Sequence, residues 1–239
     1  MLQKLNKSVE KITEYVILDL RYNTGGSLDC VQLLATILVP SARMGTPMAY
    51  LEYNDKNIDK STTIDFDQEV LKTGTNLNQN VLIVITSGTT AGAAEMLLTS
   101  LYKKDQYPNI IVMGSASKGQ TVATEQFINE TYRWSVNPVV CTVYNSDHVA
   151  GEEPFILTPS DQFKISETSI DGTTNYSQFL PFGDPKERML SIAIQTLEGT
   201  YPPKDEDKEE ETPSTKSFKI EKNVSSPASR RFAGGLRIK

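Results

Sequence analysis

The sequence predicts an α/β fold with a parallel sheet, and three observations support this fold class. Apolar runs rich in β-branched residues, each of strand length, occupy residues 15–21, 81–86 and 109–114. Segments whose apolar residues recur at helical spacing follow the first two runs, at 27–39 and 90–104. A turn of small residues comes directly after each run. Strand, turn and helix in this order indicate α/β units with parallel strands.

The first unit has clear start and stop signals. The strand "YVILDLR" (15–21) ends on a charged residue, and "YNTGG" then turns the chain. The helix over 27–39 has Ser27 as its expected cap and Pro40 as its terminator. Two weakly alternating stretches are expected to form exposed strands: 48–53 and 61–66.

Later elements are predicted in the same way. The helix over 90–104 ends in basic residues, which suit a helix carboxyl end. The last helix, over 183–199, is expected to have Asp184 as its cap and Pro185 at its first position, and to stop at Gly199. Shorter strands are expected in three stretches: 121–129, 131–136 and 139–145.

The composition changes after this last helix and divides the chain in two. Residues 1–201 have the apolar patterning of a folded core. Residues 202–239 are charged and rich in proline, serine and threonine, so we expect a mainly disordered tail. The tail ends in the basic sequence "RRFAGGLRIK", which is expected to be solvated.

Composition also excludes several classes of function. The net charge is −6 and no basic stripe is present, so a nucleic-acid partner is not expected. Cys30 and Cys141 lie in apolar contexts far apart, which predicts two buried free thiols, no metal site and no cofactor. The lone His148 is expected in a loop. No apolar run is long enough to span a membrane, and the first residues lack the apolar centre of a signal peptide.

Three turns carry the residues that point to chemistry. "LDLRYNTGG" (18–26) ends a strand on two glycines, whose backbone N–H groups can stabilise an oxyanion. "SGTTAGAAE" (87–95) leads into a helix N-terminus, which adds N–H groups and the positive end of the helix dipole. "VMGSASKGQT" (112–121) follows the third strand and contains a lysine. Gly-Gly turns are common, so the chemistry alone is a weak signal.

Taken together and in this order, the three turns resemble those of the carboxyl-terminal processing (tail-specific) serine peptidases. The resemblance covers residues 10–200 and is closest to members from gut Bacteroides-type bacteria. It implies a spiral of ββα units like that of crotonase and the caseinolytic protease subunit. It also implies a serine nucleophile with a lysine base and no cofactor. Members of the family are usually exported, whereas this chain taken literally is cytosolic, so either it is cytosolic or it is a fragment of a longer exported protein.

The resemblance further implies that the start of the family core is missing here. A peptide-binding PDZ domain usually precedes the core, and neither it nor the segment leading into it is expected in this chain. We therefore expect an N-terminally truncated core, with the missing strands supplied by a longer precursor or by another copy in a homo-oligomer.

The nucleophile loop of the family reads approximately S-A-S-A-S-E. Aligned on Glu95, it places Gly92 at the nucleophile position and Thr90 at the first serine. The implied oxyanion donors are backbone N–H groups, namely that of Ala93 and that of Gly25 or Gly26.

The lysine loop of the family reads approximately G-E-P-T-F-G-K-G. Aligned from Gly114, it places Gln120 at the lysine position, while Lys118 lies two residues earlier. The polar residue four positions after the lysine falls on Thr124. Phe155 stands where the family usually has an aspartate.

These replacements imply that the domain has lost catalysis. Gly92 supplies no attacking oxygen, and Gln120 cannot usefully accept a proton. Such a domain would bind an extended peptide or a protein chain end by adding a strand, or act as a scaffold. The alternative is an active serine-type endopeptidase that uses a displaced Thr90 with Lys118 as its base. Displacement disfavours this alternative, because about 1 Å of misplacement can cost about a hundredfold in rate.

Overall fold

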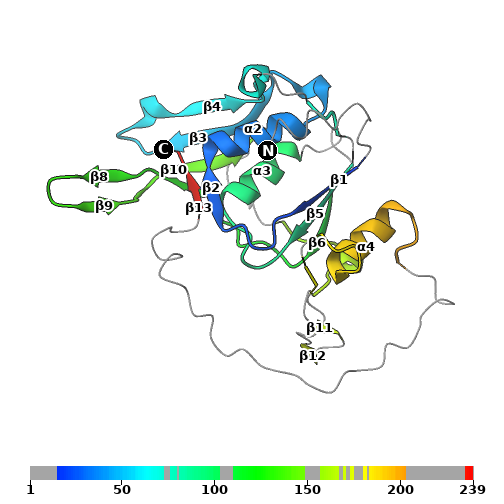
Figure 1. The fold of residues 1–239 in the computed structure, drawn as a ribbon. Coiled ribbons are helices and arrows are strands. Elements are labelled where there is room, and N and C mark those ends of the chain that lie inside the picture. The colour runs from blue at the N-terminus through cyan, green and yellow to red at the C-terminus, as the bar shows by residue number, and fades with distance from the viewer. Residues whose placement is uncertain are drawn as a thin grey trace.

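A computed structural model of the chain describes residues 15–72, 76–79, 81–102, 110–148, 157–166, 169–170, 173–174, 180–181, 183–202 and 235–238. Sheets and helices alternate in layers (Figure 1). Helices α2 (Leu28–Leu38) and α3 (Ala93–Leu101) lie between a six-stranded and a three-stranded sheet, and helix α4 (Arg188–Leu197) covers the outer face of the smaller sheet. The predicted α/β fold class is confirmed.

The three apolar runs form the three-stranded sheet. Its order is β1 (Val16–Asp19), β5 (Leu82–Thr86), β6 (Ile110–Gly114), and both pairings are parallel, as predicted. The central strand β5 is buried along its whole length because a strand flanks it on each side and helices cover both faces. The carboxyl ends of the three strands therefore meet at one edge of the sheet.

The helices between the sheets begin close to where the sequence predicts. The side chain of Ser27 caps α2 by accepting a hydrogen bond from the N–H of Cys30 at 3.4 Å. Helix α3 packs against α2, and every one of its residues is buried, because sheets lie on both sides of the pair. Leu98 of α3 joins Leu82 of the small sheet and Leu51 of the large sheet in one apolar cluster.

The six-stranded sheet has the order β2 (Gly25–Ser27), β13 (Gly235–Arg237), β7 (Val122–Thr124), β10 (Val139–Asn145), β3 (Pro47–Tyr53), β4 (Thr62–Asp65). Strand β13 is parallel to both of its neighbours, and the remaining pairs are antiparallel. The prediction of two exposed strands is wrong for β3. Its residues Met48, Ala49 and Leu51 are buried, because β10 and β4 flank the strand and α3 packs against it.

The other described elements are short. Strands β8 (Phe127–Asn129) and β9 (Trp134–Val136) form a hairpin that projects from the body (Figure 1). Strands β11 (Ser169–Ile170) and β12 (Thr173–Thr174) pair with each other. Single turns of 3₁₀ helix occur at η1 (Ser41–Arg43), η2 (Ile58–Lys60), η3 (Gln68–Leu71) and η4 (Asp161–Phe163).

Helix α4 begins later than predicted. Its cap is Glu187, whose carboxylate accepts a hydrogen bond from the N–H of Leu190 at 2.9 Å. Asp184, the predicted cap, instead accepts one from the N–H of Lys186. The other oxygen of Glu187 pairs with Arg21 at 2.9 Å. This partner lies far away in the sequence, so the local pattern could not reveal it.

The end of the predicted tail is folded. Residues 203–234 lie outside the described residues, but residues 235–238 lie between β2 and β7 in the large sheet. Leu236 is only 1% exposed and belongs to the main apolar cluster. The expectation of a solvated end is therefore wrong for these residues. The composition of the tail as a whole gives no sign that Leu236 is buried.

The structure also shows where the two cysteines and the histidine lie. Cys141 is a buried free thiol, and burial raises its pKa to about 11. Cys30 is free but exposed, so the prediction of a buried thiol is wrong there. His148 lies exposed in a turn after β10. Within the described part of the chain, no helix is long and apolar enough to cross a membrane.

Candidate active site

The three turns singled out from the sequence meet at one edge of the small sheet. They follow β1, β5 and β6, which are parallel and in register, so the turns leave the sheet side by side. Backbone hydrogen bonds join them directly. The N–H of Ala91 donates to the carbonyl of Asn23 at 3.0 Å, and the N–H of Lys118 donates to the carbonyl of Thr90 at 2.9 Å. Residues that are far apart in the sequence thus form one compact site.

The predicted oxyanion positions lie close together. A Cβ atom built on Gly26 would lie 3.3 Å from the Cβ of Ala93, so the glycine turn packs closely on the start of α3. The N–H of Gly25 donates to the side-chain oxygen of Asn23 at 3.0 Å. Because this interaction occupies the N–H of Gly25, Gly26 and Ala93 are the better candidates for stabilising a negative charge.

Gly92 lies in the turn just before α3, in a backbone conformation with φ 56° and ψ −106°. Side chains other than glycine are strained in this region, at a cost of about 1–3 kcal/mol. The carbonyl of Gly92 starts the helix by accepting a hydrogen bond from the N–H of Met96 at 2.8 Å. A tight turn thus precedes the helix, and its residue at position 92 has no hydroxyl oxygen.

Glu95 joins the nucleophile turn to the lysine loop. Its carboxylate is fully buried and accepts hydrogen bonds from three backbone N–H groups: Gly92 at 2.9 Å, Gly119 at 2.5 Å and Gln120 at 2.8 Å. These donors, together with the N-terminus of α3, compensate the burial of a negative charge. Sequence reasoning used Glu95 only as an alignment anchor. Its position in the first turn of the helix was the available signal of a cap.

Thr90 is buried and its hydroxyl is fully engaged. The hydroxyl donates to the carbonyl of Leu20 at 2.8 Å and accepts from the N–H of Ser87 at 3.0 Å. The neighbouring hydroxyl of Thr89 donates to the carbonyl of Arg21 at 2.8 Å, and the Ser87 hydroxyl donates to the same carbonyl. These hydroxyl groups hold the turn after β5 against the turn after β1.

The residues predicted from the lysine loop of the family lie in different environments. Gln120 is half-buried and touches Glu95 through its backbone, while Lys118 is exposed. A lysine acts as a base when burial disfavours its charged form, and Lys118 does not have that burial. The hydroxyl of Thr124 donates to the carbonyl of Leu236 at 3.2 Å, so it holds the C-terminal strand.

An ion-pair network centred on the buried Arg21 supports the turn after β1. Arg21 is 3% exposed and pairs with Asp19 at 2.7 Å and Glu187 at 2.9 Å. Burial raises the pKa of Asp19, but the hydrogen bonds and charge of Arg21 outweigh burial and hold that pKa below its usual range. The charged residues of "LDLR" therefore fix the turn, a role that sequence reasoning did not assign.

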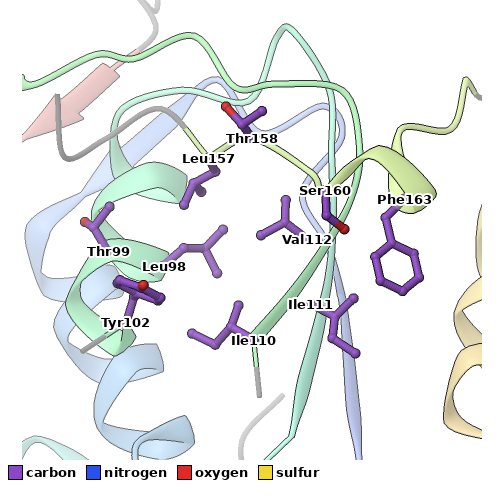
Figure 2. A pocket seen from close by; sticks show the side chains of 10 residues that line it. All are labelled: Leu98, Thr99, Tyr102, Ile110, Ile111, Val112, Leu157, Thr158, Ser160 and Phe163. Atoms are coloured by element: carbon purple, nitrogen blue, oxygen red, sulfur yellow. The ribbon is translucent and has the colours of Figure 1, made fainter. Parts of the chain in front are cut away.

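A pocket of about 540 Å³ with a largely apolar lining lies between α3, β6 and residues 157–163 (Figure 2), and Leu157 of its lining exchanges hydrogen bonds with Ser117 of the lysine loop. Leu98 and Tyr102 from the later part of α3, Ile110 and Val112 from β6, and Leu157 contribute to its lining. None of the predicted site residues is among the described residues that line it. No group of three or more histidine, cysteine, aspartate or glutamate residues is placed to hold a metal ion in the described ranges.

Comparison with known families identifies the chain. The profile of peptidase family S41 matches residues 1–152. The chain belongs to peptidase family S41. The resemblance carried by the three turns is therefore confirmed at the level of the family, together with a mixed α/β fold. Family S41 consists of serine-type peptidases.

Two solved structures are similar to this chain. A candidate S41 protease from Bacteroides fragilis is 38% identical, with a TM-score of 0.66 over 77% of this chain and 44% of its own. A lipoprotein from Streptococcus agalactiae is 24% identical, with a TM-score of 0.49 over 67% of this chain and 55% of its own. The S41 domain described here thus spans less than half of the Bacteroides protein. No curated protein sequence matches the chain.

Proposed function

We propose that this S41 domain binds extended peptides or protein chain ends and does not hydrolyse them. One observation carries the proposal. The turn before α3 keeps the tight geometry of a nucleophile turn, but Gly92 provides no oxygen there. Gln120, at the lysine position, provides no base. A peptidase that lacks both groups loses nearly all of its chemical power, because nucleophile and base act as a unit.

The peptide-binding part of the proposal has separate support. The residues at the oxyanion positions remain packed together, and the strand that contains Gly25 and Gly26 pairs in parallel with an extended segment. Strand addition uses only backbone groups, so it does not depend on the residues at positions 92 and 120. Binding can therefore persist after catalysis is lost.

The second candidate is an active endopeptidase that uses Thr90 and Lys118. The hydrogen bond between the N–H of Lys118 and the carbonyl of Thr90 favours it, because it brings the two residues together. Two observations weigh against it. The hydroxyl of Thr90 is buried and already donates to Leu20, and Lys118 is exposed.

A digest of an unfolded protein substrate distinguishes the two candidates. The native chain and a Thr90→Ala/Lys118→Ala variant would be incubated with the substrate, and the fragments identified by mass spectrometry. Trypsin serves as the positive control for substrate cleavage. We expect no specific fragments from either chain. Fragments that appear with the native chain and vanish with the variant would establish the second candidate.

A further inference from the structure

The C-terminal strand β13 occupies an unusual place in the large sheet. It lies between β2 and β7 and runs parallel to both, with Gly235, Leu236 and Arg237 opposite Gly25, Gly26 and Ser27. Among the described strands, β2 has no other partner. We call the position between β2 and β7 the strand slot. Figure 1 shows β13, in red, beside β2.

The strand slot lies between the two halves of the candidate site. Strand β2 carries the glycines of the oxyanion turn, and β7 follows the loop that contains Gln120. An external strand that paired with both β2 and β7 would need the place that β13 fills. Strand β13 therefore occupies the position expected for such a strand.

Specific contacts hold the segment in place. Leu236 is buried in the same apolar cluster as Ala93 and Ala123, and its carbonyl accepts from the hydroxyl of Thr124 at 3.2 Å. The N–H of Ile238 donates to the carbonyl of Thr124 at 3.0 Å. The segment is thus held by the buried Leu236, by Ile238 packed against the same cluster, and by backbone pairing with two strands, the kinds of contact that hold a bound peptide.

We infer that residues 235–238 are a tethered ligand of the strand slot, in which this segment of the chain takes the place of an external peptide. This inference rests on the proposed peptide-binding function. The slot accepts an extended segment, parallel to β2, with a small residue followed by a buried aliphatic side chain. The long charged connection over residues 203–234 keeps the ligand near at a high effective concentration. External chain ends must displace it.

Peptide exchange after cleavage of the connection tests this inference. A recognition sequence for a site-specific protease is inserted between Ser214 and Thr215 of the full chain, and the purified protein is cleaved without denaturant. A fluorescent peptide with the sequence of residues 230–239 is then added, and its anisotropy is followed. The matched control is the same peptide carrying Leu236→Asp.

We expect the labelled peptide to bind the cleaved chain saturably and to release the original tail fragment. The uncleaved chain should show little binding, because its tethered tail competes. The Leu236→Asp peptide should bind at least about tenfold more weakly, since a charge would replace a fully buried leucine.

Three results would overturn the inference: a tail fragment that excess peptide cannot displace, a cleaved chain that loses its cooperative thermal melt, or equal binding to cleaved and uncleaved chains. The first two would make β13 a permanent core strand. The digest reports on the proposed function independently, because a chain that hydrolyses its substrate refutes the loss of catalysis whatever the peptide does.

Discussion

The backbone part of the candidate site retains more of the features expected of a peptidase than the side-chain part does. The backbone part contains the adjacent Gly26 and Ala93 and the network around Glu95. The side-chain part has a glycine at position 92 and a glutamine at position 120. The hydrogen bonds of Glu95 stabilise the fold whether or not the site is catalytic. If the domain has lost catalysis, as we propose, a serine at position 92 would only add strain. Under this proposal, fold stability explains why the backbone part persists without the side-chain part.

The largest effect is expected at Gly114, which ends β6 beneath the lysine loop. Its φ is +106°, and an added Cβ would lie 2.2 Å from the carbonyl oxygen of Thr86. Gly114→Ala should lower the free energy of unfolding by about 4 kcal/mol, from overpacking together with backbone strain. Urea unfolding measures this loss. The control is Gly45→Ala, where φ is +77° and no atom lies within 4 Å, and it should lose only about 1–2 kcal/mol. Equal losses would show that the contact with Thr86 is unimportant.

The next effect is expected at Glu95. Glu95→Ala leaves three backbone N–H groups without their acceptor and should cost about 3 kcal/mol of unfolding free energy. The matched control is Glu69→Ala at an exposed position, which should stay within about 0.5 kcal/mol of the native chain. Denaturant titrations of both variants provide the comparison. A loss below about 1 kcal/mol at Glu95 would mean that its network does not hold the two loops together.

A smaller loss is expected when the nucleophile position regains a side chain. Gly92→Ser should lower stability by about 1–3 kcal/mol because of its backbone conformation. Gly88→Ser, in the same turn but with open space and no positive φ, should be nearly neutral. Thermal melts of the two variants measure the difference. If Gly92→Ser were as stable as Gly88→Ser, strain would not favour glycine at position 92.

The smallest effect concerns Asp19 and pH. Its pKa is lowered in the folded chain, so its charge stabilises the fold above the unfolded pKa and this contribution disappears as pH falls through the folded value. When the pH is lowered below about 4, the free energy of unfolding should therefore fall less for Asp19→Asn than for the native chain. Unfolding at pH 6 and pH 3 measures the slope, with Asp59→Asn at an exposed position as the control. If the free energy of unfolding fell as much between pH 6 and pH 3 for Asp19→Asn as for the native chain, Arg21 would not be stabilising the charged form of Asp19.

Local signals in the sequence were sufficient for the parallel strands and the cap at Ser27. They failed where a distant residue decides the structure. Arg21 sets the start of α4 through Glu187, and the strand slot captures Leu236 from a charged tail. The positions of Gly92 and Gln120 came from resemblance to the family. The role of Glu95 needed the structure, because two of its donors come from another loop.

Active-site labelling tests the central claim, that the backbone part persists without the chemistry, most directly. The native chain and a Gly92→Ser/Gln120→Lys variant would be treated with a fluorophosphonate probe, and the adducts located by intact-mass and peptide mass spectrometry. We expect no adduct on the native chain and an adduct at position 92 of the variant. An adduct at Thr90 of the native chain would contradict the loss of catalysis. A folded variant without an adduct would contradict the persistence of the backbone part.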